Sequence, residues 1–443
     1  MRKIISLLLI TAFFISLSSN ISAEFSYYKN ISLPQGISAE GVYIVDLGAD
    51  VLSTDDNTVL YSKNYTSAFF PASLTKIMTA IIVIEKYSTQ QELEAETQTM
   101  TEQINVTVLR ANASNAGIKV GETLNLKDLL YCLLLPSGAD AALMLADHVS
   151  DGKIENFVTL MNNKAHAIGA ESTFFTNVHG LHDDSQVTTI ANVERITKYA
   201  LYTMNNSALF RTIVGSAEYT LPQTDMQNQR KIYNTNKLLR PDSPYYTEGV
   251  TGVKTGNTDK AGQCLISTCN KNGFNLFAVV MKSADNINGP NSFTDTKALY
   301  DWVFNTYAIT NVCNYINPVL KAKVNQAVKG SETVDLIINE DILRIVPKSA
   351  TGSITVVPKE DVTTLKAPLT RGQAVAKADI KLEDNILATV DLIVKEDIKR
   401  DFKYMIYDYL IYIAIAAVSL LIALIIIIAL IRKNRPRRSG RYF

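Results

Sequence analysis

Ser73 and Lys76 lie three residues apart in the stretch PASLTKIMTA, where together they could carry out nucleophilic chemistry. In a helix, positions i and i+3 share one face, so the lysine amine can reach the serine hydroxyl. A serine hydroxyl is a poor nucleophile without a base, and lysine acts as a base only when burial lowers its pKa. The apolar neighbours that would bury the amine are Ile77, Met78, Ile81 and Ile82.

Pro71 comes two residues before Ser73 and favours a helix that begins close to the serine. The N-terminal end of such a helix carries a partial positive charge, which would stabilise negative charge developing on a substrate oxygen. Serine and lysine are common residues, so this spacing by itself does not identify an enzyme. The spacing indicates a catalytic site only if other segments of the chain supply the remaining residues.

Two further segments carry polar residues that could complete such a site. Ser137 follows an apolar helical run in LLLPSGADAA, while Lys254, Thr255 and Gly256 lie on a predicted strand in GVKTGNT. A lysine and a threonine at the edge of a cleft can hold a carboxylate, and a glycine beside them lets a substrate backbone lie close. On a helix, a loop and a strand, in this order, these segments match the S-x-x-K, S-x-N and K-T-G motifs of penicillin-interacting serine enzymes.

The segments PASLTKIMTA, GETLNLKDLLYCLLLPSGADAA, NVHGL and GVKTGNTDKAGQCLISTC resemble the low-molecular-mass penicillin-binding proteins that are serine-type D-alanyl-D-alanine carboxypeptidases. The resemblance covers residues 40–308, and the β-rich region and membrane anchor that follow resemble the family's layout. It implies an α/β (α+β) fold, a penicillin-binding-protein/β-lactamase-like transpeptidase body. Members of the family remove the terminal D-alanine from peptidoglycan stem pentapeptides through an acyl-enzyme.

The resemblance implies three catalytic roles. Ser73 would be the nucleophile, Lys76 its general base, and Ser137 would relay a proton towards the leaving group. The substrate would be a peptidoglycan stem peptide, and β-lactams would inhibit the enzyme by acylating the same serine. The resemblance implies no cofactor and no metal.

The same resemblance implies how the third motif binds the substrate. Lys254 and Thr255 would bind the terminal carboxylate, and Gly256 would lie beside it. The backbone N–H groups of Asn257 and Ser73 would form the oxyanion hole.

Two positions depart from the pattern of the family. Its second motif usually ends in Asn, but SGA places Ala139 there, followed by Asp140. Asp140 could compensate for the missing amide, although we expect it to be an ordinary first-turn acid of the next helix. The family often carries an Arg just before the last helix of the body, where this chain has Asn291 and Ser292. Carboxylate binding would then depend mainly on the third motif.

His179 and His182 in HGLHDD raise the alternative of a metal pair or a catalytic base. An HGL segment recurs in the resembled family without a metal, so we expect a turn near the rim of the site.

Two other classes of protein stay open as alternatives. Ala139 and the missing arginine motivate a weakly catalytic or non-catalytic protein that binds peptidoglycan or penicillin. A β-lactamase would share the three motifs, but the C-terminal β region and membrane helix argue against it. The 443 residues carry no net charge, so nothing predicts a nucleic-acid partner.

Both ends of the chain carry membrane-related signals. A basic pair, a short apolar run and small residues precede Glu24, and this pattern predicts a secretory signal peptide; an uncleaved anchor is the alternative. Residues 410–431 carry no charge, and a helix of that length crosses a hydrocarbon core of about 30 Å. Basic residues follow this helix and place the C-terminus in the cytoplasm. We therefore expect a single-pass protein of the cell membrane, with its catalytic domain on the cell-wall side.

Six segments are predicted along the chain. Short strands lie at both ends of the body with helices between them, which predicts an antiparallel sheet closed by the first and last strands. The segments are a signal peptide at 1–23, the catalytic domain at 24–308, a β-sandwich-like domain at 309–394, a charged linker at 395–409, the transmembrane helix at 410–431 and a basic cytoplasmic tail at 432–443.

Overall fold

The computed structural model describes residues 24–433, with gaps at 26–27, 29–30, 49–56, 88, 285–288 and 351–353. The predicted signal peptide and most of the predicted basic tail lie outside the described residues. The chain divides into two units. The first is Met1–Ile309 with Ile345–Ala350, and the second is Thr310–Arg344 with Thr351–Phe443.

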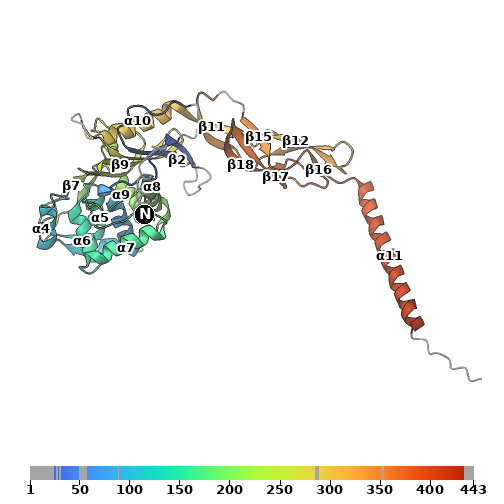
Figure 1. Ribbon diagram of the computed structural model, residues 1–443, viewed down its shortest axis with the longest axis horizontal. Coiled ribbons are helices and arrows are strands. Elements are labelled where there is room, and N and C mark those ends of the chain that lie inside the picture. Colours follow the sequence, from blue (N-terminus) through green and yellow to red (C-terminus); the bar gives the residue numbers. More distant parts are fainter. Residues whose placement is uncertain are drawn as a thin grey trace, which may run out of the picture. The chain divides into compact units, whose positions relative to one another are not determined.

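An antiparallel sheet of six strands forms the centre of the first unit (Figure 1). The first long strand pairs with the last, so that Val45 lies opposite Phe277, as the strand order in the sequence predicts. Every residue of GVYIVD in β2 is buried, because helices cover both faces of the sheet. In spatial order the strands are β1 (Glu24–Phe25), β3 (Thr58–Lys63), β2 (Gly41–Asp46), β10 (Phe274–Ser283), β9 (Gly262–Lys271) and β8 (Val250–Thr258).

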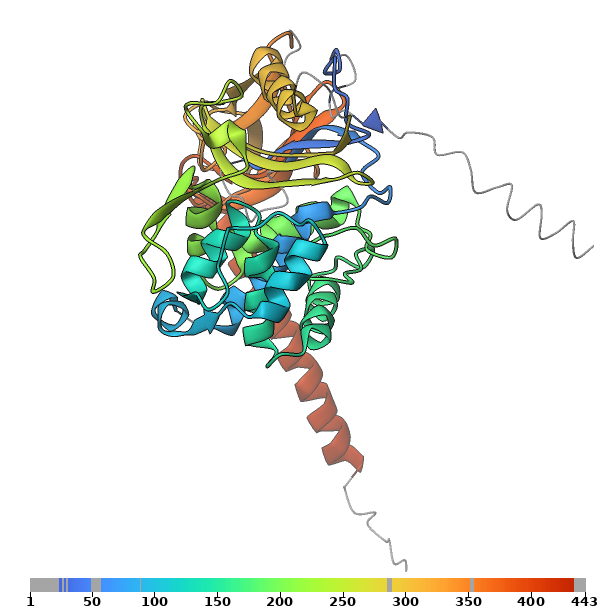
Figure 2. The same ribbon diagram turned by 90° about the vertical axis from the view of Figure 1, so that its left-hand side faces the viewer.

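Helices lie on both sides of this sheet. Figure 2 shows α10 (Asn291–Thr306) over one face and the remaining helices of the unit gathered beyond the other. The helices on that second side are α2 (Lys76–Lys86), α3 (Gln90–Ala95), α4 (Glu102–Arg110), α5 (Leu126–Leu134), α6 (Ala139–Val149), α7 (Ile154–Ala167), α8 (Ile190–Lys198) and α9 (Ser207–Gly215). Three short turns of helix, η1 (Ala72–Thr75), η2 (Tyr199–Thr203) and η3 (Lys237–Leu239), and two strand pairs, β4 (Thr97–Thr99) with β5 (Thr123–Asn125) and β6 (Glu218–Leu221) with β7 (Arg230–Tyr233), complete the unit.

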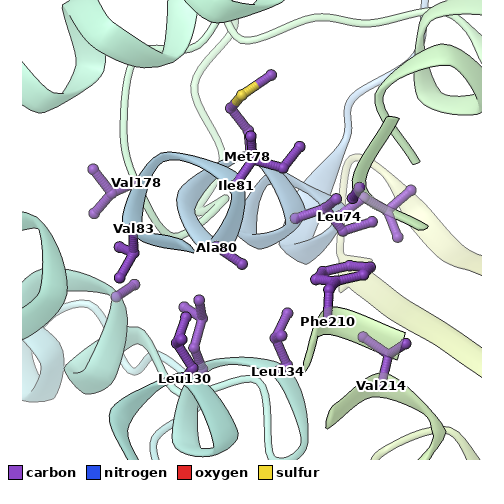
Figure 3. Packing of buried hydrophobic residues seen from close by; sticks show 14 of the residues in the cluster. Leu74, Met78, Ala80, Ile81, Val83, Leu130, Leu134, Val178, Phe210 and Val214 are labelled. Carbon is purple, nitrogen blue, oxygen red and sulfur yellow. The ribbon is translucent and has the colours of Figure 1, made fainter. Parts of the chain in front are cut away.

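Helix α2 is the centre of the helical layer and is buried on nearly every side. Figure 3 shows Leu130 and Leu134 of α5 facing Ala80, with Val178 at one end of the helix and Phe210 near the other. A helix that is apolar all round is stable only inside a protein core, so α2 is fixed by its neighbours. Lys76, at its first position, is held with the same rigidity.

The second unit contains an all-β domain with one long helix after it, as predicted. In β12 the residues LKAKVN alternate between exposed and buried, as expected for a sheet with one face on a core. The sheet order is β15 (Ile354–Pro358), β17 (Ala374–Leu382), β18 (Asn385–Val394), β13 (Thr333–Ile337), β12 (Leu320–Asn325) and β16 (Thr364–Lys366). A separate two-stranded sheet of β11 (Tyr307–Cys313) and β14 (Ile342–Pro347) does not belong to this unit alone, because the division of the chain falls within both strands.

Helix α11 (Phe402–Lys433) contains the whole apolar run of the predicted membrane helix. Among the described residues it is the one helix long and apolar enough to cross a membrane. It begins eight residues earlier than predicted and takes in the end of the predicted linker. Asp401 accepts a hydrogen bond from the Lys403 N–H at 2.9 Å at the start of the helix, and the guanidinium of Arg400 contacts Asp408 at 2.5 Å and Gln326 at 2.8 Å.

Replacing Ile81 in the centre of α2 tests how strongly this core holds the body together. The side chain is fully buried, so Ile81→Ala should lower the free energy of unfolding by about 2–5 kcal/mol. Leu109→Ala on α4 is the matched control; its side chain is 64% exposed, and the change should stay within about 0.5 kcal/mol. Thermal unfolding of the full chain in detergent measures both, and equal effects would contradict the packing described for α2.

Candidate active site

Ser73 and Lys76 are in contact, as their spacing predicts. The Lys76 amine lies 2.9 Å from Ser73 Oγ and donates a hydrogen bond of 2.6 Å to the carbonyl of His179. The α-helix begins at Lys76 and not near Ser73, because Ala72–Thr75 forms a 3₁₀ turn. A 3₁₀ helix has three residues per turn, so positions i and i+3 lie directly above one another. The tighter turn therefore brings the amine and hydroxyl together more directly than an α-helix would.

The backbone around Ser73 is held in an uncommon conformation by close packing. Ala72 has a φ of +46°, which is costly for a residue with a side chain. Gly180 packs against it so tightly that a Cβ there would lie 1.9 Å from Ala72 O. Gly256 lies against the other side, where a Cβ would be 3.2 Å from Pro71 O. Two glycines thus fix the position of the serine without contributing a side chain.

His179 acts on the site through its backbone. Its carbonyl accepts the hydrogen bond from Lys76, and its Nδ1 accepts one from the Leu181 N–H at 3.2 Å. Burial and then the charge of Lys76 lower the pKa of His179 to about 4, so its ring is neutral at neutral pH. His182 interacts with Asp184 at 3.1 Å. The HGL segment is a turn, as expected, but it also supplies a direct partner for the lysine.

Ser137 lies in the turn between α5 and α6. Asn125 caps the start of that helix by accepting from the Asp128 N–H, and the helix stops before Pro136. Ser137 has a φ of +64°, its carbonyl accepts from Ser114 Oγ at 2.7 Å, and its own hydroxyl is buried. Within the described residues this hydroxyl has no hydrogen-bond partner, so it is free to bond a substrate.

Asp140 has a larger part in the site than its position in the first turn of α6 predicts. The side chain is 1% exposed and accepts from the N–H groups of Ala116 at 2.8 Å, Ile118 at 3.4 Å and Ala141 at 2.9 Å. It therefore fixes the loop that forms one wall of the cleft. Its carboxylate is also a charge partner of Lys76. The sequence predicts Asp140 only as an ordinary first-turn acid or a substitute for the missing amide, because both of these contacts depend on the tertiary fold.

The third motif lies along β8, beside the serine. Lys254 is 1% exposed, and its amine donates to Thr255 O at 3.0 Å. The Thr255 hydroxyl is bonded to the hydroxyl of Thr235 at 2.7 Å. Asn257 faces the cleft two residues further on, next to the glycine that packs on Ala72. The motif thus places a buried amine and a hydroxyl on the strand whose glycine packs against the turn that carries the serine.

A cleft of about 540 Å³ opens over these residues. Ser73, Lys76 and Asn257 line it directly, whereas Ser137 and Lys254 are buried beside it. The HGL turn and Ala139 also line the cleft, and the turn was expected near the rim of the site. Sequence reasoning missed the remaining lining, which comes from residues 111–114 and 258–260. Ser292, at the predicted arginine position, is buried at the start of α10 and its N–H donates to Gln263.

Burial sets the electrostatics of the site. It lowers the pKa of Lys76 to about 7, although the Asp140 carboxylate opposes the shift. It also lowers the pKa of Lys254 well below its usual value, and the charge of Lys76 adds to that effect. Burial raises the pKa of Asp140, while its three backbone donors and Lys76 favour its ionised form. A neutral Lys76 can accept the proton of Ser73 while one of its own N–H groups holds the His179 carbonyl.

Comparison with known proteins agrees with this geometry. Residues 37–285 match the family model described as D-alanyl-D-alanine carboxypeptidase, and these residues are more than half of the chain. The chain belongs to the D-alanyl-D-alanine carboxypeptidase family. This confirms the resemblance seen in the motifs and, with it, a serine-type carboxypeptidase activity. Residues 317–400 match the model described as penicillin-binding protein 5, C-terminal domain, in agreement with the all-β domain of the second unit.

Individual relatives extend the match over most of the chain. The D-alanyl-D-alanine carboxypeptidase DacF of Bacillus subtilis is 26% identical over 80% of this chain and 85% of its own length. A D-alanyl-D-alanine carboxypeptidase of a Streptomyces species is 30% identical over 54% of this chain and 81% of its own.

Solved structures share the fold. Penicillin binding protein 5 from Haemophilus influenzae superposes with a TM-score of 0.59 at 24% identity, covering 84% of this chain and all of that one. A Streptomyces DD-transpeptidase superposes with a TM-score of 0.54 at 28% identity, covering 62% of this chain and 99% of that one.

The pKa of Lys76 predicts how acylation depends on pH. The amine must be neutral to accept a proton, so the acylation rate constant should be low near pH 5.5 and rise through a midpoint of about pH 7. Asp140→Asn removes the charge that favours the protonated amine, so its midpoint should lie at lower pH. The rate of covalent labelling by a fluorescent penicillin, measured across this pH range, gives both midpoints. A midpoint at higher pH in the variant would contradict the role of Asp140 as the charge partner of Lys76.

Proposed function

We propose that Ser73, Lys76 and Ser137 form the catalytic group of this carboxypeptidase, with peptidoglycan stem pentapeptides as its substrates. The observation that carries the proposal is the contact between Ser73 Oγ and a buried lysine amine whose pKa is about 7. A pKa lowered this far leaves the neutral form of the amine populated at neutral pH, so it can act as a base.

The proposed reaction has two stages. Lys76 takes the proton of Ser73 while the serine oxygen attacks the carbonyl carbon of the penultimate D-alanine. The backbone N–H groups of Ser73 and Asn257 stabilise the oxyanion. The C–N bond then breaks, and the Ser137 hydroxyl gives its proton to the amine of the departing D-alanine while it takes up the proton held by Lys76, so the lysine is neutral again. Water, activated by the same lysine, hydrolyses the ester and restores the serine.

Substrate recognition rests on the third motif. The carboxylate of the terminal D-alanine would bind Thr255 and the ammonium of Lys254, with Gly256 leaving room for the peptide backbone. An arriving carboxylate favours the charged form of Lys254, against the burial that lowers its pKa. Recognition and protonation of Lys254 would therefore be coupled.

Replacing Ser73 with alanine tests the nucleophile. Wild-type protein should bind a fluorescent penicillin covalently and release D-alanine from a diacetylated tripeptide ending in D-Ala-D-Ala, whereas Ser73→Ala should do neither. Labelling without release of D-alanine would favour the non-catalytic binding protein that Ala139 motivates, and Ala139→Asn could then be tested for gained turnover. Rapid loss of the label would favour a β-lactamase.

We also propose that α11 anchors the protein in the cell membrane, with the body on the cell-wall side and the tail in the cytoplasm. Support comes from the exposure of α11 on all sides and from the basic residues after it. The secretory signal at 1–23 would direct export.

A tag fused after Phe443 tests the orientation. The tagged protein should stay in the membrane fraction after alkaline carbonate extraction, and the tag should resist protease added outside intact protoplasts. A tag that is cleaved while the membrane remains sealed would reverse the proposed topology.

A further inference from the structure

Thr235 lies between β7 and η3, in a segment that is held from several directions. Its N–H donates to the carbonyl of Leu135 at 2.9 Å, two residues before Ser137. The side-chain amide of Asn234 donates to Ser216 O at 2.9 Å. The N–H of Asn236 donates to Asn234 Oδ1, also at 2.9 Å. The backbone of Thr235 is therefore fixed beside both the second motif and the third.

The hydroxyl of Thr235 meets the third motif directly. Its Oγ1 lies 2.7 Å from Oγ1 of Thr255, and either oxygen can be the donor. A hydroxyl has a single hydrogen to donate. If Thr255 donates to Thr235, that hydrogen is used within the protein. If Thr235 donates, the hydrogen of Thr255 is left for a substrate carboxylate.

We propose that Thr235 is a positioning residue for carboxylate recognition, which donates to Thr255 and so leaves the Thr255 hydrogen for the terminal carboxylate of the substrate. The inference rests on the proposed function of the third motif. A substrate carboxylate bound to Thr255 favours the arrangement in which Thr255 donates to the carboxylate and Thr235 donates to Thr255. Each hydrogen bond in such a chain strengthens the next. The effect matters here because Ser292 occupies the position where the family often has an arginine.

A comparison of two probes isolates this role. Benzylpenicillin carries a free carboxylate and its methyl ester does not, while both present the same β-lactam carbonyl to Ser73. Thr235→Val removes the hydroxyl but keeps the N–H that bonds Leu135. The variant should be acylated about tenfold more slowly by benzylpenicillin and at an unchanged rate by the ester. Thr235→Ser should restore the preference for the acid.

Thr251 provides the matched control. It lies four residues before Thr255 on the same strand, and its hydroxyl is bonded to that of Thr268 at 2.8 Å, away from the cleft. Thr251→Val should leave both acylation rates within twofold of wild type.

Two results would overturn the inference: equal slowing with both probes, which is the mark of a purely structural role, or no slowing with benzylpenicillin. Wild-type protein that neither probe acylates would instead remove the proposed function on which the inference depends. The two failures are therefore distinguishable in one experiment.

Discussion

The site depends on the amine of Lys76, which is buried in the protein core and can therefore lose its proton near neutral pH. Lys76 begins a helix whose other residues are almost all apolar and buried, so its charged form lacks the water that would stabilise it. The His179 carbonyl gives the amine one fixed partner, and Asp140 restores part of the stability of its charged form. A lysine without Asp140 would have an even lower pKa and would be a weaker base. The balance between burial and one carboxylate thus sets the strength of the catalyst.

The second buried lysine makes this balance depend on the substrate. Lys254 and Lys76 repel each other, and burial disfavours the charge on both. A substrate with a terminal carboxylate brings the missing negative charge and allows Lys254 to be protonated. A peptide without that carboxylate would bring no negative charge to offset a positive charge on Lys254. In the proposed reaction, a preference for a free C-terminus would therefore follow from the electrostatics of the site as well as from hydrogen bonding.

The sequence predicted those parts of the site that depend on local spacing, and it missed those that depend on the fold. Ser73 and Lys76 are three residues apart, so any helical turn brings them together. The strand order predicted the antiparallel sheet in the same way, because strands at both ends of the body with helices between them favour pairing of the first strands with the last. The contacts of Asp140 with the loop at Ala116 and of Thr235 with Thr255 could not be predicted, since these partners lie more than twenty residues away or on another element. A backbone carbonyl such as that of His179 has no signature in a sequence at all.

The contacts of Lys76 also decide what the loss of the usual asparagine at Ala139 means. Such an amide could have two functions, to hold the lysine and to bind the substrate. In this protein the lysine is already held by the His179 carbonyl and by the packing of α2. Ala139 begins α6, donates its N–H to Ser114 O at 2.8 Å and leaves its small side chain on the wall of the cleft. The substitution therefore removes a contact to the substrate and leaves the base in place. We therefore expect acylation to survive this change, with the peptide backbone held less tightly than it would be beside an asparagine.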